Sequence, residues 1–176
     1  MAATDRSPDN PNYLSPLGFR FILTRTPKTN YYVQNVTLPS ATLSTVEIPN
    51  PLVTVPYPGD KLQYDPLILT FMVDEDMTNY LEMYDWLTGL GFPENSDQRK
   101  RLMANSPTFE KGFAGIMSDG TLYALTSHQN VNVKVMFRDM FPVSLSDLTF
   151  DSTLTDVEYL RATVSFRYTS YTIEKM

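Results

Sequence analysis

The segment LILTFMVDEDMTNYLEMYDWLTGL, residues 67–90, changes its hydrophobic period half-way along. Up to residue 73 the apolar positions alternate, which is the period of a half-buried strand. After residue 76 they recur every three or four residues, which is the period of an amphipathic helix. The expected apolar stripe consists of Met77, Tyr80, Leu81, Tyr84 and Leu87, widened by Met83, Trp86 and Leu90. The pattern therefore predicts a strand followed directly by a helix over about residues 77–90.

Three carboxylates stand at the joint between these two elements: Asp74, Glu75 and Asp76. Acidic side chains stabilise the start of a helix because the first turn has unpaired N–H groups and a partial positive charge. Asp76 is the expected N-cap. The alternative interpretations are a hydrolase that uses Asp74 or Asp76 and a calcium loop. Neither the opposed carboxyl pair nor the glycine-containing loop that such sites require is evident.

Two pairs of short apolar runs predict β-hairpins. FRFILT (residues 19–24) and YYVQNVTL (31–38) have strand character, and TPKTN between them predicts a turn. FAGIMSDGTLYALTS (113–127) contains Asp119-Gly120, a dipeptide that is favoured in tight hairpin turns.

Two later segments alternate over a longer stretch. The first is expected to present one apolar face made of Val131, Val133, Val135 and Phe137. In the second, one face is expected to hold Leu160, Ala162, Val164, Phe166 and Tyr168. The other face of that segment would then hold Arg161, Thr163, Ser165 and Arg167. Both patterns predict strands with one buried face.

Residues 39–66 combine six prolines with β-branched and apolar residues. Because proline has no N–H group to donate to a ladder, the pieces between the prolines can pair only at edges or ends. The pattern predicts a protruding arm or edge hairpin, which must find a strand edge because an unpaired one would aggregate. Its expected assembly contacts are Val46, Ile48, Leu52, Val53, Val55 and Tyr57.

These patterns together predict a mainly β fold, an antiparallel β-sandwich or barrel with one flanking helix and a protruding proline-rich arm. At 176 residues the chain is expected to form a single domain. Residues 1–18 are polar and contain three prolines, so they are expected to form an extended N-terminal arm.

Composition excludes several classes of function. The chain has no cysteine, which excludes disulfides, thiolate metal sites and cysteine nucleophiles. Its net charge of −6 argues against a protein that coats nucleic acid, because phosphate would be repelled. No apolar run is long enough to cross a membrane, and the first residues lack the pattern of a secretory signal.

Signals for catalysis or for a cofactor are weak. The one histidine, His128, lies in the polar stretch SHQN with no second metal ligand spaced near it, and is expected at the surface. No nucleophile elbow and no phosphate-binding glycine motif occurs. The basic residues Arg99, Lys100 and Arg101 are expected to form a solvated face or a protein-contact patch. We therefore predict a protein that is not an enzyme and that uses no cofactor or metal.

Three segments, in their order and spacing, resemble the tail tube proteins of contractile-tailed bacteriophages. They are KLQYDPLILTFMVDEDMTNYLEMYDWLTGL (61–90), LRATVSFRYTSYTI (160–173) and the opening GFRFIL with YYVQNVTLPSATLSTVEIPNP (18–23 and 31–51). The similarity spans most of the chain from Gly18 to Ile173. In that family the segments would be a strand with its helix, the long final strand, and a hairpin that leads into an exchanged arm.

The resemblance implies a β-sandwich subunit that assembles into hexameric rings around a lumen. Such rings stack into a tube that conducts the genome and that contacts a sheath and a baseplate. The chain would then be part of a virion tail assembled in the host cytoplasm. An acidic subunit would suit a lumen through which DNA slides without specific binding, although Arg161 and Arg167 oppose a uniformly negative wall.

Other functions stay open at this point. The same fold serves several baseplate and tube-initiator proteins, and it also forms the tube of the type VI secretion system. The matched residues do not distinguish a main tail tube from a tube initiator, a terminator or a baseplate ring. A function of another class is a monomeric β-sandwich that binds carbohydrate through some of its 11 tyrosines and 10 phenylalanines.

Overall fold

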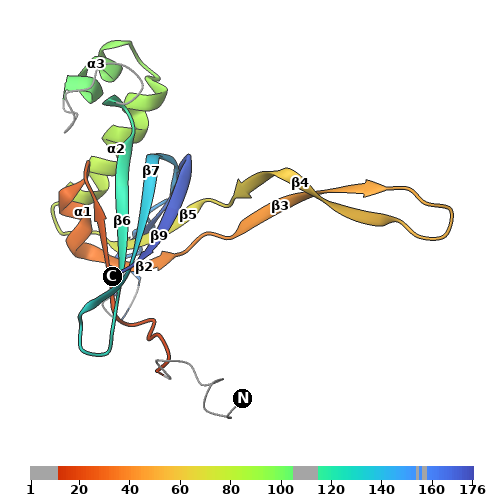
Figure 1. The fold of residues 1–176 in the computed structure, drawn as a ribbon. Helices are drawn as coiled ribbons and strands as arrows, with labels where there is room; N and C mark the ends of the chain where they lie inside the picture. Colours follow the sequence, from red (N-terminus) through yellow and green to blue (C-terminus); the bar gives the residue numbers. More distant parts are fainter. Residues whose placement is uncertain (1–11, 105–114, 154, 156–157) are drawn as a thin grey trace.

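The computed structural model describes residues 12–104, 115–153, 155 and 158–176. Its strands are β1 (Phe19–Leu23), β2 (Val33–Thr37), β3 (Ala41–Ile48), β4 (Val55–Tyr64), β5 (Leu67–Met72), β6 (Ser118–Leu125), β7 (Val131–Leu145), β8 (Arg161–Arg167) and β9 (Ser170–Lys175). The helices are α1 (Pro27–Tyr32), α2 (Thr78–Gly91) and α3 (Asp97–Ala104). Figure 1 shows a β body flanked by helices, with one long arm. The predicted mainly β, sandwich-like fold is confirmed, without a closed barrel.

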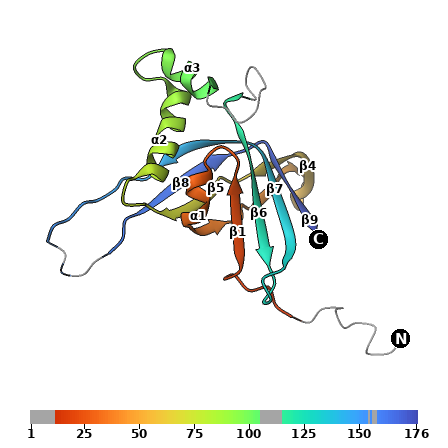
Figure 2. The same cartoon turned by 90° about the vertical axis from the view of Figure 1, so that its left-hand side faces the viewer.

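The long strand β7 links the two halves of the body. Its first part pairs with β6 and β9, and its second part pairs with β8. The strand order is β1-β6-β7-β8-β5-β2, and Figure 2 shows β1, β6, β7 and β9 side by side. Between the two parts Asp139 adopts a φ of 56°, and the buried positions change from Val135 and Phe137 to Met140. A single bulged strand therefore serves both halves.

The core fills the space between the two halves and α2. The predicted inward faces of β5 and β8 are confirmed, because their alternate residues are fully buried. The largest buried side chains are Trp86, Phe21, Phe71, Phe137, Phe166, Leu23, Leu67, Leu69, Met83, Met140 and Val164. None of the helices in the described ranges has the length and apolarity that crossing a membrane requires.

Helix α2 forms where the sequence predicts it, and it buries Met83 and Trp86 of the expected stripe but leaves other members of that stripe exposed. Leu81 and Tyr84, expected to face the core, are 48% and 49% exposed. The buried residues are Asn79, Met83, Trp86 and Gly89. The amide of Asn79 donates to the Met72 carbonyl at 2.7 Å, so this buried polar side chain is satisfied on the inward face of the helix. The inward face of α2 therefore centres on Met83 and Trp86, and the Leu81 and Tyr84 side of the predicted stripe faces outward.

The predicted hairpin between residues 19–24 and 31–38 is wrong. Strand β1 pairs with β6, whereas β2 pairs with β5. The expected turn is the short helix α1, with Pro27 at its first turn. The side-chain oxygen of Asn30 accepts from the Leu23 N–H at 2.8 Å, and its amide donates to the Leu23 carbonyl at 3.2 Å. The Asn30 side chain therefore satisfies the backbone N–H and C=O groups at the end of β1, which the second strand of a hairpin would otherwise have paired.

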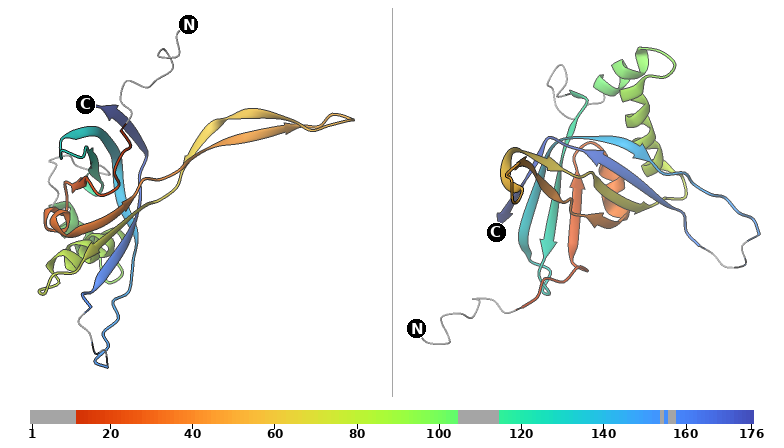
Figure 3. Two further views of the ribbon diagram at one scale, coloured as in Figure 1. Left: turned by 90° about the horizontal axis from the view of Figure 1, so that it is seen from below. Right: turned by 90° about the vertical axis from the view of Figure 1, so that its right-hand side faces the viewer.

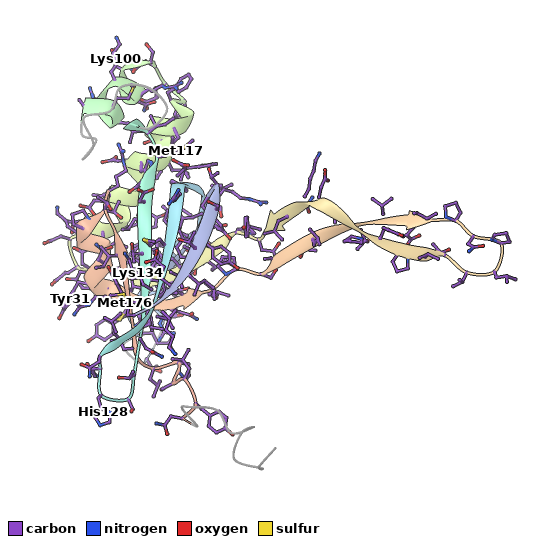
Figure 4. The ribbon with its side chains drawn as sticks, viewed as in Figure 1. Tyr31, Lys100, Met117, His128, Lys134 and Met176 are labelled. Carbon is purple, nitrogen blue, oxygen red and sulfur yellow. The ribbon has the colours of Figure 1, made fainter. Side chains whose placement is uncertain are left out.

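The predicted turn at Asp119-Gly120 is also wrong, since both residues lie within β6. The β6–β7 hairpin turns at residues 126–130, where the Gln129 N–H donates to the Thr126 carbonyl at 2.8 Å. Gly120 is required for packing: a Cβ atom there would lie 2.5 Å from the sulfur of Met140. His128 lies exposed at this turn, as expected, at the opposite end of the body from Lys100 (Figure 4).

The final segment is two strands rather than one. Strand β8 pairs with β5 and with the second part of β7, and the chain then breaks at Tyr168 and Thr169. Strand β9 continues along the first part of β7. The break follows from β7 itself: because β7 changes halves at its bulge, a strand that follows it must also break to keep its ladder.

Strands β3 and β4 form a separate two-stranded sheet that projects far from the body (Figure 3). This arm extends the β2–β5 pair without a slip in register, from Thr37 opposite Ile68 to Ala41 opposite Tyr64. Pro39 and Pro66 occupy matching positions at the interruption between the two ladders. Because neither proline can donate to a ladder, the sheet ends there and the arm leaves the body.

Candidate assembly arm

The outer half of the arm has one apolar face and one polar face. Val46 lies opposite Tyr57 and Ile48 opposite Val55, so these four side chains share a face. Thr45, Glu47, Pro56 and Pro58 occupy the other face. The exposed fractions of Val46, Ile48, Val55 and Tyr57 are 57%, 47%, 37% and 56%. We call these four residues the apolar arm face.

The tip of the arm is also apolar and exposed. Leu52 is 96% exposed and Val53 is 63% exposed. The arm thus brings together the six expected contact residues, four on one face and two at the tip. A two-stranded hairpin of this kind gains little stability by itself, because its apolar side chains stay in water. The structure leaves this surface without a cover from the described part of the chain.

A bulge in β4 separates the outer arm from the inner arm. The register shifts between Leu43 and Thr45, where β4 carries extra residues around Gly59. A Cβ atom at Gly59 would lie 2.3 Å from the hydroxyl oxygen of Ser44 and 2.6 Å from its carbonyl oxygen. Only glycine fits this approach of the two backbones, and the bulge adds twist to the arm.

The base of the arm is held by side chains and backbone groups that we call the arm root: Pro39, Ser40, Tyr64, Asp65, Arg167, Tyr168 and Tyr171. The Tyr168 hydroxyl donates to the Asp65 carbonyl at 2.8 Å, and the Tyr171 hydroxyl donates to the Pro39 carbonyl at 3.4 Å. The Ser40 hydroxyl donates to the Asp65 carboxylate at 2.5 Å. Arg167 donates to the Tyr64 carbonyl at 3.4 Å. Side chains at and beside the break between β8 and β9 therefore bind both chain segments at the base of the arm.

Aromatic contacts connect the arm root to the core. The ring of Tyr64 lies 5.0 Å from that of Tyr171 and 5.9 Å from that of Tyr168. The buried ring of Phe137 lies 5.2 Å from that of Tyr168. Edge and tilted arrangements at these separations are favourable. Burial, followed by the neighbouring Tyr171, Tyr64 and Asp65, raises the pKa of Tyr168 to about 12, so its hydroxyl remains a donor at neutral pH.

Sequence reasoning missed the arm root. Its tyrosines were expected only to fill the core or the sheet surface, because alternation says nothing about contacts across 100 residues. The one available signal was the position of Tyr168 and Tyr171 on either side of two polar residues that interrupt the final apolar alternation.

The acidic cluster serves the start of α2, but through a different residue than expected. Asp76 is not the cap: Met77 precedes the helix in a left-handed conformation and no side chain caps from that position. Asp74 accepts a hydrogen bond from the Thr78 hydroxyl and another from the Asn79 N–H at 3.1 Å. A tight turn, closed by the Met77 N–H on the Asp74 carbonyl at 2.9 Å, brings Asp74 back to the helix.

The environment of Asp74 favours its ionised form. Burial alone would raise the pKa of Asp74, but the hydrogen bonds from Thr78 and Asn79 outweigh it and lower the pKa below its ordinary value. This is the chemistry of a helix cap. Among the described residues no group of three or more His, Asp or Glu side chains is placed to hold a metal ion.

The side chains of the three basic residues of α3 lie in three different surroundings. Arg99 lies over the ring of Phe92 at 5.8 Å, and Lys100 pairs with Asp97 at 2.8 Å. Arg101 lines a cavity of about 380 Å³ between α2, α3 and the start of α1. Consecutive helix residues are about 100° apart, so they do not share a face. The structure does not bring them together as one patch.

The outward face of β8 carries Arg161 and Arg167 at its two ends. Between them Thr163 lies on the same face, with its hydroxyl 3.2 Å from that of Thr70 on β5. The alternation predicted from the sequence is therefore confirmed on both faces of this strand.

Comparison with known proteins identifies the family. The profile of the family described as "Phage tail tube protein" matches residues 12–174, nearly the whole chain. The chain belongs to the phage tail tube protein family. The resemblance inferred from sequence is confirmed, and so are the expectations that this tail tube family member is a structural protein rather than an enzyme and that it is a part of the tail. The hydrolase interpretation of Asp74 and Asp76 is therefore wrong.

One curated relative of this tail tube family member is the tail tube terminator protein of Enterobacteria phage T4. It is 29% identical over 122 residues, which are 67% of this chain and 61% of that protein. The match thus spans less than two thirds of the length of the relative.

Solved structures share the fold over nearly the full chain. The tube terminating cap of the anti-feeding prophage superposes with a TM-score of 0.67 at 16% identity, covering 100% of both chains. The sheath/tube terminator of an extracellular contractile injection system has a TM-score of 0.59 at 16% identity, covering 94% of this chain and 99% of the other. A chain of the sheath-tube complex of an extracellular contractile injection system superposes with a TM-score of 0.55 at 12% identity, covering 100% of this chain and 99% of the other.

Proposed function

We propose that this chain is a ring-forming subunit that terminates a tail tube. The observation that carries the proposal is the sequence match to the tail tube terminator of phage T4. Two of the solved structures that share its fold are also named as a tube terminating cap and a sheath/tube terminator. This choice is narrower than the family, which includes the tube itself.

In the proposed ring, six copies contact one another through strand edges and through the arm. Five of the described strands are paired on one side only: β1, β2, β9 and the two strands of the arm. Closing a ring covers such edges, which otherwise template aggregation. The apolar arm face supplies the second contact, because its four side chains gain free energy only when a neighbour removes them from water.

The ring would leave a central opening for the passage of DNA and would contact the remaining tail components, including the sheath and the baseplate, from its outer side. Leu81 and Tyr84, about half exposed on the outer side of α2, are candidates for those outer contacts. The six arm residues remain the candidates for contacts between copies.

The second candidate is a subunit of the tube itself. Agreement of the fold with the sheath-tube complex of an extracellular contractile injection system, with a TM-score of 0.55 over the whole chain, favours it. The two functions differ in how the assembly grows, because a tube subunit adds to rings of its own kind and a terminator does not.

The test is to purify the chain and measure its mass by light scattering, then image it by negative stain. A terminator is expected to give single rings of defined mass with a central opening. Tubes of variable length made of this chain alone would instead establish the tube-subunit function. A chain that stays monomeric across the concentration range would contradict both.

A further inference from the structure

The two edges of the arm are not equivalent. Antiparallel pairs alternate between those that exchange both backbone hydrogen bonds and those whose N–H and C=O groups point away from each other. Pro56 lies opposite Glu47, and Pro58 lies opposite Thr45. Because proline has no N–H group, both pairs must be of the second kind. The outer edge of β4 therefore lacks donors at Pro56 and Pro58.

The outer edge of β3 is intact over the same length. Thr45 and Glu47 belong to these two pairs of the second kind. Their N–H and C=O groups therefore point away from β4, toward the outer edge of β3. Nearer the root the Asp65 N–H donates to the Ser40 carbonyl at 3.1 Å, so the next pair, Ala41 with Tyr64, also points its groups outward. Strand β3 thus offers a regular row of donors and acceptors at Ala41, Leu43, Thr45 and Glu47.

Such an edge is the kind that soluble proteins protect. Prolines and charged residues are common means of protection, and β4 has both within its length. Strand β3 has no proline between Ala41 and Ile48 and a single charge, at Glu47. Nothing in the described part of the chain pairs with its outer edge. Because the outer edge of β3 is unprotected and that of β4 is blocked by prolines, the arm is suited to pair with another strand through β3 alone.

We propose that the arm docks on a second copy of this chain by adding the outer edge of β3, and not that of β4, to a sheet of that copy. The chain itself supplies an edge that lacks a neighbour. Strand β9 pairs only with β7, and its Ile173 lies opposite the buried Val135, on the core side of the sheet. Ile173 is nevertheless 58% exposed, which a strand added at that edge would correct. This inference rests on the proposed ring and states how its copies are joined.

The decisive variant is Thr45→Pro with Glu47→Pro. It removes two outward N–H groups but leaves the exchanging pairs Val46–Tyr57 and Ile48–Val55 within the arm. Loss of two intermolecular hydrogen bonds is expected to weaken association, measured by light scattering across a dilution series, by at least about tenfold. Thr45→Ala with Glu47→Ala controls for the side chains, and Pro56→Ala with Pro58→Ala controls for the other edge. Both controls are expected to associate as the wild type does.

Hydrogen exchange of the wild-type chain gives a measurement that needs no folded variant. The amides of Thr45 and Glu47 are expected to exchange rapidly in the monomer and slowly in the assembly. Two outcomes would overturn docking through the β3 edge without contradicting the ring: equal exchange of these amides in both states, or association of the double-proline variant as strong as that of the wild type. Stronger association of the Pro56→Ala, Pro58→Ala variant would assign docking to the outer edge of β4, and would therefore also overturn docking through β3. A wild-type chain that never associates would overturn the ring itself.

Discussion

The hydroxyl of Tyr168 donates a 2.8 Å hydrogen bond to the backbone carbonyl of Asp65, which is 103 residues earlier in the chain. This bond joins the break between the last two strands to the point where the arm leaves the body. It shows that the arm is not a loose extension: its base is fixed against a core that includes Phe137. An arm held at its base loses less conformational entropy when it docks on a neighbour.

Tyr168→Phe is expected to loosen the base of the arm without unfolding the body. The loss of one hydrogen bond of about 0.5–1.5 kcal/mol predicts a roughly twofold to tenfold faster hydrogen exchange in β3 and β4. The melting temperature should change little. Tyr171→Phe is the matched control, because its hydroxyl bond to Pro39 is longer, at 3.4 Å, and should matter less. Unchanged exchange in the Tyr168 variant would contradict a fixed root.

Val46→Ser with Tyr57→Ser is expected to weaken ring formation strongly while leaving the fold intact. These two side chains face each other on the apolar arm face and are 57% and 56% exposed, so they contribute little to the isolated subunit. If a neighbour buries both, their loss predicts association weaker by at least about a hundredfold. Sizing with light scattering gives the measurement. Thr45→Ser with Glu47→Gln, on the opposite face, should assemble normally, and equal loss in both variants would argue against a docking face.

Asp74→Ala is expected to destabilise the protein by about 0.5–2 kcal/mol, because Asp74 accepts the bonds that begin α2. Since the pKa of Asp74 is lowered in the folded state, its contribution is present above the ordinary carboxyl range and is lost as the pH falls through the folded value. Urea denaturation should therefore show that the free energies of unfolding of the wild type and of Asp74→Ala differ less at pH 3 than at pH 7. Asp76→Ala should stay within about 0.5 kcal/mol of the wild type at both pH values.

Phe166→Ala is expected to cost about 3–5 kcal/mol, measured by the same denaturation, because the side chain is fully buried. Its ring lies 5.9 Å from that of Trp86 and joins β8 to α2. Arg167→Ala, on the exposed face next to it, should lower the free energy of unfolding far less. If the Phe166 variant folded normally and failed only to assemble, the two faces of β8 would be reversed.

Much of the local structure follows from the sequence. Alternation in β5 and β8 predicts their buried faces, because a strand places successive side chains on opposite sides whatever its partner is. The prolines between residues 39 and 66 predict an arm, because a missing N–H group forbids a central position in any sheet. The apolar arm face follows from the same two rules once the register of β3 and β4 is known.

What the sequence could not determine is which elements meet. Strand β1 pairs with β6 rather than β2, and Asp74 caps α2 rather than Asp76. Both outcomes depend on close contacts formed in the folded chain: the Asn30 side chain on Leu23, and the turn that places Asp74 beside Thr78. The arm root joins groups from residues 39, 65 and 168, whose proximity exists only after β7 has linked the two halves. Periodicity and proline chemistry act within a few residues, so they determine the elements, whereas strand pairing is selected by the packing of the whole core.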